Sequence, residues 1–243
     1  MPIDASARPA ESGSPCRPKA SPLGLLVAFS LLALATLAGA ADRAIVEDWS
    51  RQGPGSRGIP DGWQGQKWGS PTYDFTVVAV DGRRALHLRS RNESSTIARD
   101  LRGAVDLEET PILEWSWKAV TLPRGGDSRR KATDDQAAQI YVAWERFPAA
   151  VRSRIIGYVW DTTAPVGTVV RSEKTGTVTY VIVRSGPEGL GTWITERRNV
   201  AEDFRRIYGE APASPDAVSI SIDTNDTSST AESFMGPIFF TRP

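Results

Sequence analysis

The sequence predicts an all-β fold: an antiparallel two-sheet β-sandwich of jelly-roll type, with one short helix in its C-terminal half. Three observations support this prediction. Short segments of alternating apolar and polar residues recur along the chain, separated by turn residues. An Asp-Gly pair, Asp81-Gly82, joins two of these segments as a hairpin. One segment carries clear helix boundaries at both ends, Asn199 and Gly209.

The first forty residues have the pattern of a secretory signal peptide. An apolar run, Leu23–Leu37, follows Arg17 and Lys19 and ends in Ala38-Gly-Ala40. We expect cleavage after Ala40, so that residues 1–40 are removed and residues 41–243 form a single β-sandwich domain. That domain would be periplasmic or secreted, without a stable membrane span. An uncleaved anchor is the alternative, and the shortness of the run argues against it.

Composition excludes several kinds of function. The 29 basic and 29 acidic residues give a net charge of zero, which provides no electrostatic basis for binding nucleic acid. The only cysteine, Cys16, lies in the predicted signal peptide, so the mature chain has no disulfide and no catalytic thiolate. His87 is the only histidine, which excludes a site that needs two. Oligomeric state is not predictable from these data.

The strands are predicted from their period of two. In the hairpin 73–90, Leu86 and Leu88 face inward, and His87 faces outward. Further strands are expected at 96–101, 111–120, 139–144, 155–160, 177–184, 192–197, 217–223 and 234–240.

The helix is predicted from its boundaries and its apolar stripe. Asn199 is a good N-cap residue, Glu202 completes a capping box, and Gly209 ends the helix. Val200 and Phe204 begin a stripe at helical spacing that would dock on the sandwich.

The segment 45–68 is expected to be a strand followed by a long loop that carries Trp49, Trp63 and Trp68. Three tryptophans in a loop either plug the end of a sandwich or form a stacking platform for sugars. The structural interpretation is favoured, since large aromatic side chains contribute much of core burial.

Several ordered motifs resemble the bacterial family known as domain of unknown function 3047. They are Lys131-Ala-x-Asp-Asp, Ile140-Tyr-Val, Gly157-Tyr-Val-Trp160, Val183-Arg-Ser-Gly186, Gly189-Leu-Gly-x-Trp193, Glu196-Arg-Arg-Asn-Val200, Asp203-Phe-Arg-Arg206 and Ile222-Asp-Thr-Asn-Asp-Thr227. The chain departs from the usual family form at Gly157 and at Asn225-Asp226. The resemblance implies a secreted jelly-roll domain similar to galactose-binding-like and carbohydrate-binding modules. It implies no activity.

The first candidate site is a polar strand face. Polar residues alternate with apolar ones on the strands 111–120, 139–144 and 217–223, and their polar sides would converge if these strands are neighbours. Carboxylate, amide, hydroxyl and guanidinium groups suit sugar hydroxyls or an anionic ligand. The alternative is an ordinary solvated sheet face. The candidate ligand-binding residues are Glu114, Asp135, Gln139, Tyr141, Arg184 and Asp223.

The second candidate site is acidic. Asp134, Asp223 and Asp226 are weak candidates to bind a metal ion, because Ca²⁺ prefers oxygen ligands in loops. Their spacing matches no contiguous calcium loop, and the alternative is that they form ion pairs or cap turns. No cofactor is therefore predicted, apart from this possibility of Ca²⁺.

The function predicted from these features is non-catalytic binding of a glycan or another envelope component by an exported β-sandwich. No catalytic residue is assigned. One alternative is a glycan-active hydrolase that uses two of the carboxylates, which must lie about 5 to 9 Å apart. Another is a structural or assembly protein of the cell envelope, whose polar face a protein partner would cover.

Overall fold

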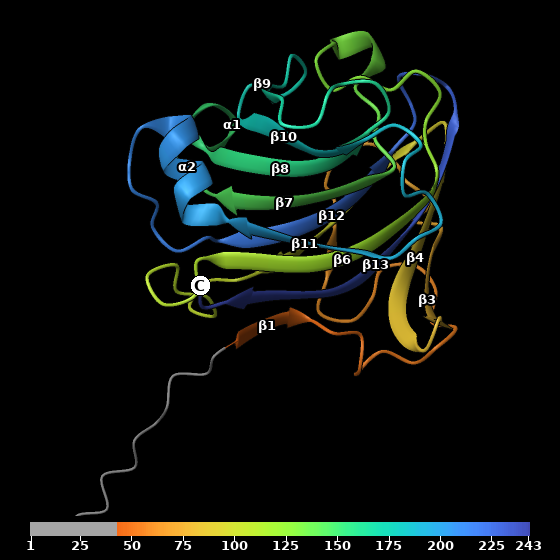
Figure 1. The fold of residues 1–243 in the computed structure, drawn as a ribbon, viewed down its shortest axis with the longest axis horizontal. Helices are drawn as coiled ribbons and strands as arrows, with labels where there is room; N and C mark the ends of the chain where they lie inside the picture. The colour runs from red at the N-terminus through yellow and green to blue at the C-terminus, as the bar shows by residue number, and fades with distance from the viewer. Residues whose placement is uncertain (1–42) are drawn as a thin grey trace, which may run out of the picture. The chain divides into compact units, whose positions relative to one another are not determined.

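The computed structural model describes residues 43–243, which form a β-sandwich of two sheets (Figure 1). The predicted signal peptide at residues 1–40 lies outside this described part of the chain. The fold class predicted from the alternating segments is confirmed.

The first sheet has six strands, in the order β11, β6, β13, β4, β3, with β1 paired to the C-terminal half of β13. Its strands are β1 (Arg43–Glu47), β3 (Phe75–Val80), β4 (Arg83–Arg91), β6 (Ile112–Thr121), β11 (Ile194–Asn199) and β13 (Thr230–Thr241).

The second sheet has seven strands, in the order β2, β5, β12, β7, β8, β10, β9. Its strands are β2 (Gln64–Gly65), β5 (Ser94–Asp100), β7 (Ala138–Trp144), β8 (Arg154–Asp161), β9 (Val169–Arg171), β10 (Val178–Ser185) and β12 (Ala217–Asp223). A 3-10 turn, η1 (Lys131–Thr133), precedes β7, and a short helix, α1 (Ala149–Arg152), joins β7 to β8.

One strand pair corrects the prediction of purely antiparallel sheets. β8 and β10 run parallel, with Tyr158 opposite Val181. The connection between them carries β9, which pairs antiparallel with β10 and returns the chain to its starting end. Parallel neighbours require a long connection of this kind. Periodicity reports which face a residue takes, but it carries no information on strand direction.

The predicted hairpin is confirmed in β3 and β4. Asp81 and Gly82 both have left-handed φ angles, 51° and 74°. This is the backbone of a type I′ turn, whose twist matches that of the flanking strands. Leu86 and Leu88 are buried as predicted.

The core lies between the sheets and is rich in tryptophan. Trp115 and Trp117 of β6 are fully buried, and Trp115 packs against Tyr158 of β8 with 5.4 Å between ring centroids. The predicted inward residues of β7 and β12 are buried as well: Ile140, Val142, Trp144, Val218, Ile220 and Ile222. Burial of these faces leaves the alternate residues of β7 and β12 on the outer face of the second sheet.

Helix α2 (Val200–Tyr208) is confirmed with its boundaries. The Asn199 side chain accepts a hydrogen bond from the backbone N–H of Glu202, and Gly209 ends the helix with φ of 72°. Phe204 packs edge-on against Trp144 at 4.5 Å, which docks the helix on the sandwich. Within residues 43–243, neither α1 nor α2 has the length and apolar character needed to span a membrane.

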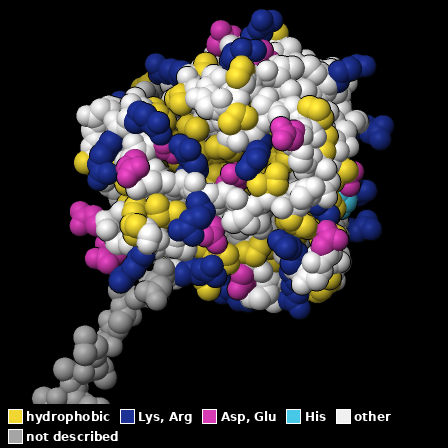
Figure 2. All heavy atoms as spheres, in the orientation of Figure 1, with side chains coloured by type: hydrophobic (Ala, Val, Ile, Leu, Met, Phe, Trp, Pro, Cys, Tyr) yellow, Lys and Arg dark blue, Asp and Glu magenta, His cyan; other side chains and the backbone are white. Residues whose placement is uncertain are grey.

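Surface charges of both signs alternate over the visible face of the molecule (Figure 2). This mixture agrees with the balance of 29 basic and 29 acidic residues. Any electrostatic selectivity must therefore come from local arrangements of charge.

Candidate functional site

A groove of about 700 Å³ lies on the outer face of the second sheet, and we call it the outer-face groove. Its floor consists of alternate residues of five strands: Thr96, Gln139, Tyr141, Ala143, Ile155, Val178, Tyr180, Ser219, Ser221 and Asp223. One wall is formed by residues 66–71 and 92–94, and the other by Lys131, Asp134, Lys174 and Thr175. Ligand sites commonly have this volume and a polar floor within apolar surroundings.

The strand register explains why the floor residues meet. Ser219 of β12 lies opposite Tyr141 of β7, Tyr141 opposite Gly157 of β8, and Gly157 opposite Tyr180 of β10. Directly opposed residues on one face are close neighbours. The outward-facing residues of these neighbouring strands thus form one continuous polar and aromatic surface.

Gly157 makes room for the aromatic part of this floor. A Cβ atom at this position would lie 2.6 Å from Cε1 of Tyr141 and 3.1 Å from Cδ1 of Tyr180. Without that atom the two tyrosine rings approach to 6.4 Å between centroids. The absence of a side chain at position 157 therefore determines how closely the two rings pack.

Trp68 stands on the first wall with its side chain 63% exposed. Gln66 ties this wall to the floor, because its side chain accepts a hydrogen bond from Thr96 N at 2.7 Å and donates to Trp68 O at 2.9 Å. The other two tryptophans of the loop plug the sandwich as favoured: Trp49 and Trp63 are buried and stack at 6.0 Å. The indole of Trp68 is thus an aromatic surface presented to the groove.

A hydrogen-bond relay runs from the floor into the second wall. The Tyr141 hydroxyl donates to Gln139 Oε1, and Gln139 Nε2 donates to Gln136 Oε1 at 2.6 Å. Gln136 Nε2 in turn donates to Asp134 Oδ1 at 2.8 Å and to Ser128 Oγ at 3.0 Å. Each amide has both ends engaged, so the floor is rigid before any ligand arrives.

Asp134 anchors the second wall. Its other oxygen, Oδ2, accepts hydrogen bonds from the Ser172 and Tyr180 hydroxyls, each at 3.2 Å. Burial raises the pKa of Asp134, even though these donors favour the charged form. The carboxylate orients the aromatic floor as well as facing the groove.

Asp223 is the most perturbed carboxyl group of the groove. Burial, and after it the charge of Asp135, raise the pKa of Asp223 to about 7, although Lys174 acts in the opposite direction. Its Oδ1 accepts a long hydrogen bond, 3.4 Å, from Asn225 N, and the Ser94 side chain also hydrogen-bonds to the carboxyl group. Strongly shifted groups in a cleft are candidate functional residues.

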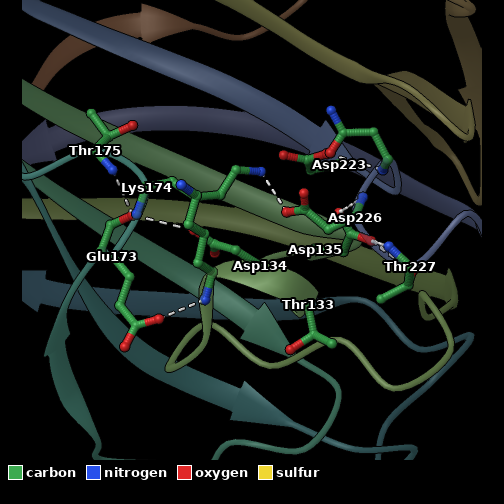
Figure 3. A network of polar contacts seen from close by, with 12 residues as sticks. Thr133, Asp134, Asp135, Glu173, Lys174, Thr175, Asp223, Asp226 and Thr227 are labelled. Atoms are coloured by element: carbon green, nitrogen blue, oxygen red, sulfur yellow. Dashed lines mark hydrogen bonds and ion pairs between the residues drawn. The ribbon is translucent and has the colours of Figure 1, made fainter.

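Lys174 extends along the second wall to the Asp226 carboxylate, close to Asp134 and Asp223 (Figure 3). Burial opposes its charge, but Asp226, Asp223 and Asp134 outweigh this effect and hold the pKa of Lys174 above its usual value. This single ammonium group is shared among several carboxylates.

Of the candidate residues, the structure brings Gln139, Tyr141 and Asp223 together in the groove and places Glu114 and Arg184 elsewhere. Glu114 lies on β6, in the first sheet, where it pairs with Arg197 at 2.6 Å. The polar face of β6 therefore does not join those of β7 and β12, which corrects the expected convergence. Arg184 pairs with Glu196 at 2.6 Å and does not line the groove.

Asp135 is also corrected, because its carboxylate is fully buried behind the floor. Oδ1 accepts from Asp226 N at 3.1 Å, and Oδ2 accepts from the backbone N–H and the hydroxyl of Thr227, both at 2.6 Å. These bonds clasp the loop after β12 to the start of β7. Asp135 is therefore a structural residue beneath Asp223 and not a contact residue.

The acidic candidates do not assemble into a metal centre. Asp226 is engaged by Lys174, and the Asp134 oxygens accept bonds from Gln136, Ser172 and Tyr180. Within residues 43–243, no group of three or more His, Cys, Asp or Glu side chains is placed to hold a metal ion.

Trp68 and Lys174 are among the groove residues that were absent from the sequence candidates. The loop of Trp68 was considered as a stacking platform, but sequence does not distinguish which of its three tryptophans remains exposed. Lys174 lies in the turn-rich connection before β10, where no periodicity exists to place a side chain.

Comparison with solved structures gives β-sandwich proteins at low identity. A family 30 carbohydrate-binding module of a cellulosomal cellulase of Clostridium thermocellum shares 12% identity at a TM-score of 0.41, over 82% of this chain and 97% of the module. The xyloglucanase domain of NopAA, a type three effector from Sinorhizobium fredii, shares 11% identity at a TM-score of 0.40, over 79% and 100%.

The CBM22-1 xylan-binding domain from Paenibacillus barcinonensis Xyn10C shares 13% identity at a TM-score of 0.34, over 78% of this chain and 96% of that domain. At these identities and TM-scores, the ligands of those proteins do not carry over to this chain. Among curated proteins, none matches the chain significantly. A family model described as "Protein of unknown function (DUF3047)" matches residues 61–239.

Proposed function

The chain belongs to the DUF3047 family of proteins of unknown function, as its motifs predicted, and we propose that it binds a glycan, without catalysis, in the outer-face groove. The glycan would be an envelope component if the chain is exported as its N-terminal sequence predicts. Binding at the groove uses Gln139, Tyr141 and Asp223 together with Trp68.

The observation that carries this proposal is an exposed indole beside a polar floor. A sugar ring has an apolar face formed by its C–H groups and an edge of hydroxyl groups. The first suits the indole of Trp68, and the second suits the Ser219 hydroxyl and the Asp223 carboxyl group. Here the exposed indole faces a groove of ligand size.

The floor also has the rigidity that weak polar contacts require. Tyr141, Gln139 and Gln136 are fixed by the relay to Asp134, so binding loses little side-chain entropy at these positions. Sugar hydroxyls exchange water for protein partners with a small net gain per bond. A preorganised site is therefore the arrangement that gives measurable affinity.

The test is calorimetric titration of the protein with a panel of neutral hexasaccharides built from glucose, mannose, xylose and N-acetylglucosamine. For any sugar that binds, Trp68→Ala should weaken affinity about ten-fold or more, through loss of the stacking surface. Phe147→Ala is the matched control, since Phe147 is 88% exposed and lies outside the groove. Equal affinity of Trp68→Ala and the unchanged protein would contradict the proposal.

One observation favours a second candidate function, a glycan hydrolase that uses Asp223 with Asp134. A carboxyl group with a pKa of about 7 is protonated in a large fraction of molecules near neutral pH and can then act as a general acid. Incubation with each bound oligosaccharide decides between the two functions. New reducing ends that Asp223→Asn abolishes would establish the hydrolase, whereas intact sugar after prolonged incubation supports binding alone.

A further inference from the structure

The outer-face groove is short of positive charge. Three acidic residues line it, Glu93, Asp134 and Asp223, against Lys131 and Lys174. Two more carboxylates lie next to these: Asp135 raises the pKa of Asp223 through its charge, and Asp226 holds the ammonium group of Lys174.

The imbalance is greatest around Lys174. Asp134, Asp223 and Asp226 all act on this one ammonium group, and Asp135 adds a fourth carboxylate beneath Asp223. Figure 3 shows the Lys174 side chain directed to Asp226, with Asp223 on the adjacent strand end. Since Asp226 accepts the hydrogen bond from Lys174, this ammonium group compensates the charge of Asp223 only through space.

The charges of Asp134 and Asp223 both act on Tyr141, in the middle of the floor. A ligand lying on Tyr141 therefore meets negative potential from two sides. The π faces of Tyr141, Tyr180 and Trp68 add to this potential, because an aromatic face attracts cations. Among the described residues that line the groove there is no arginine, the side chain best suited to hold a sugar carboxylate.

Resting on the proposed function, we propose that the outer-face groove selects a cationic amino sugar, with the ammonium group of the sugar placed against the Asp223 carboxylate. The ammonium would supply the charge that the cluster lacks and donate hydrogen bonds to a carboxylate whose other donors are uncharged, the Asn225 backbone N–H at 3.4 Å and the Ser94 side chain. A uronic acid or other acidic sugar would be repelled by the same carboxylates. Asp223 thus determines specificity, while Trp68 and the remaining floor provide general affinity for sugar.

Calorimetric titration at pH 7 and low salt tests the selection with a cationic probe and a neutral probe. These are a β-1,4-linked hexamer of glucosamine and its fully N-acetylated counterpart, which has the same length and linkage but carries neutral acetamido groups in place of the amino groups. We expect the glucosamine hexamer to bind at least about ten-fold more tightly, as for a hydrogen bond between charged groups. This preference should decrease as salt is added, because salt screens the attraction.

Asp223→Asn should bring the ratio of the two affinities to about one. Asp100→Asn is the control for a lost carboxylate, since Asp100 pairs with Arg102 and does not line the groove. This control should leave the ratio as it is in the unchanged protein.

Lys174→Gln should change the ratio of the two affinities in the opposite direction from Asp223→Asn. Removal of the competing ammonium group should increase the preference for the glucosamine hexamer several-fold. A misfolded variant would not show such an increase. A preference that falls in Lys174→Gln would overturn the proposal.

The remaining outcomes separate this inference from the proposed function. Equal or tighter binding of the N-acetylated hexamer overturns the selection of a cation and leaves glycan binding standing. Binding of neutral hexamers of glucose, mannose or xylose alone would likewise overturn the selection of a cation and leave glycan binding standing. Failure of every sugar to bind overturns both.

Discussion

Asp223 shows a conflict between stability and function in a single side chain. The fold buries its carboxyl group beside Asp135, which disfavours the charge, and the neighbouring cation, Lys174, is held by Asp226. A carboxyl group kept in such surroundings destabilises the folded state whenever it is ionised. Residues of this kind are expected where binding, and not stability, determines the side chain.

Asp223→Asn should therefore stabilise the protein at high pH. The folded pKa of about 7 lies above the ordinary value of 3.8, so the stability linked to the proton is complete below pH 3.8 and is lost as pH rises through 7. Asparagine does not ionise, so the variant keeps this stability at high pH. Above pH 7 its free energy of unfolding should exceed that of the unchanged protein by at most about 4 kcal/mol, reduced by the partial exposure of residue 223.

Urea unfolding of both proteins at pH 4.5, 6 and 8 measures this difference. The titration takes place next to the Asp135 carboxylate and Lys174, with Asp134 and Tyr141 also near, so the midpoint reports the whole cluster. A constant difference across the three pH values, or a variant less stable at pH 8, would contradict the prediction.

Gly157→Ala tests the packing of the aromatic floor. The added methyl group would lie within 2.6 Å of the Tyr141 ring, so the ring must shift. We expect a loss of about 1–3 kcal/mol in unfolding free energy and weaker sugar binding, as for overpacking in a tight site. Gly53→Ala is the control, because its nearest contact is ordinary at 3.4 Å. Unchanged stability would show that the ring can move freely.

At this scale the sequence predicted which side chains of regular strands reach the surface. Gln139, Tyr141 and Asp223 follow from alternation in β7 and β12. Asp134 and Asp135 are adjacent in a loop and both buried, and nothing in the sequence says that the first lines the groove while the second lies behind its floor. Which of two neighbouring loop residues faces inward depends on hydrogen bonds to Thr227, far away in the chain.

At the scale of elements, the clasp made by Asp135 holds the wall of the groove in place. Its three accepted bonds join the segment before β7 to the loop that follows β12. Because that loop also carries Asp226, which holds Lys174, the clasp positions the charged wall indirectly.

Asp135→Ala should lower the free energy of unfolding by about 2–4 kcal/mol, since the Asp226 and Thr227 donors lose a charged acceptor. Amide hydrogen exchange should increase first at these two positions. Asp74→Ala is the matched control, because Asp74 forms an exposed pair with Arg89, worth less than about 1 kcal/mol. Similar losses of unfolding free energy in the two variants would show that the Asp135 hydrogen bonds contribute no more to stability than an exposed ion pair.

Strand existence and facing were predictable for nearly every element, because burial of one face imposes a period of two. The pairing of strands was less predictable from the sequence. The parallel arrangement of β8 and β10 and the placement of β6 in the opposite sheet both depend on long connections. Such connections have no local pattern that specifies their path.

At the scale of the molecule, export stays a prediction. The described residues begin at Arg43, just after the expected cleavage site. Mass spectrometry of the protein recovered from the periplasmic fraction or the medium should give an N-terminus at Ala41. A chain that retains residues 1–40 and remains with the membrane would instead indicate an anchor.

The outer-face groove unites parts of the chain that are far apart in sequence. One wall is made by residues 66–71 and 92–94, the other includes Lys174, and β12 contributes to the floor. Folding of such long-range arrangements is slow, because distant segments must lose chain entropy by coming together before their contacts stabilise the structure. The groove cannot exist on a partly folded chain, so ligand binding is itself a reporter of completed folding. During refolding, binding should return only with the last kinetic phase, after the secondary structure has formed.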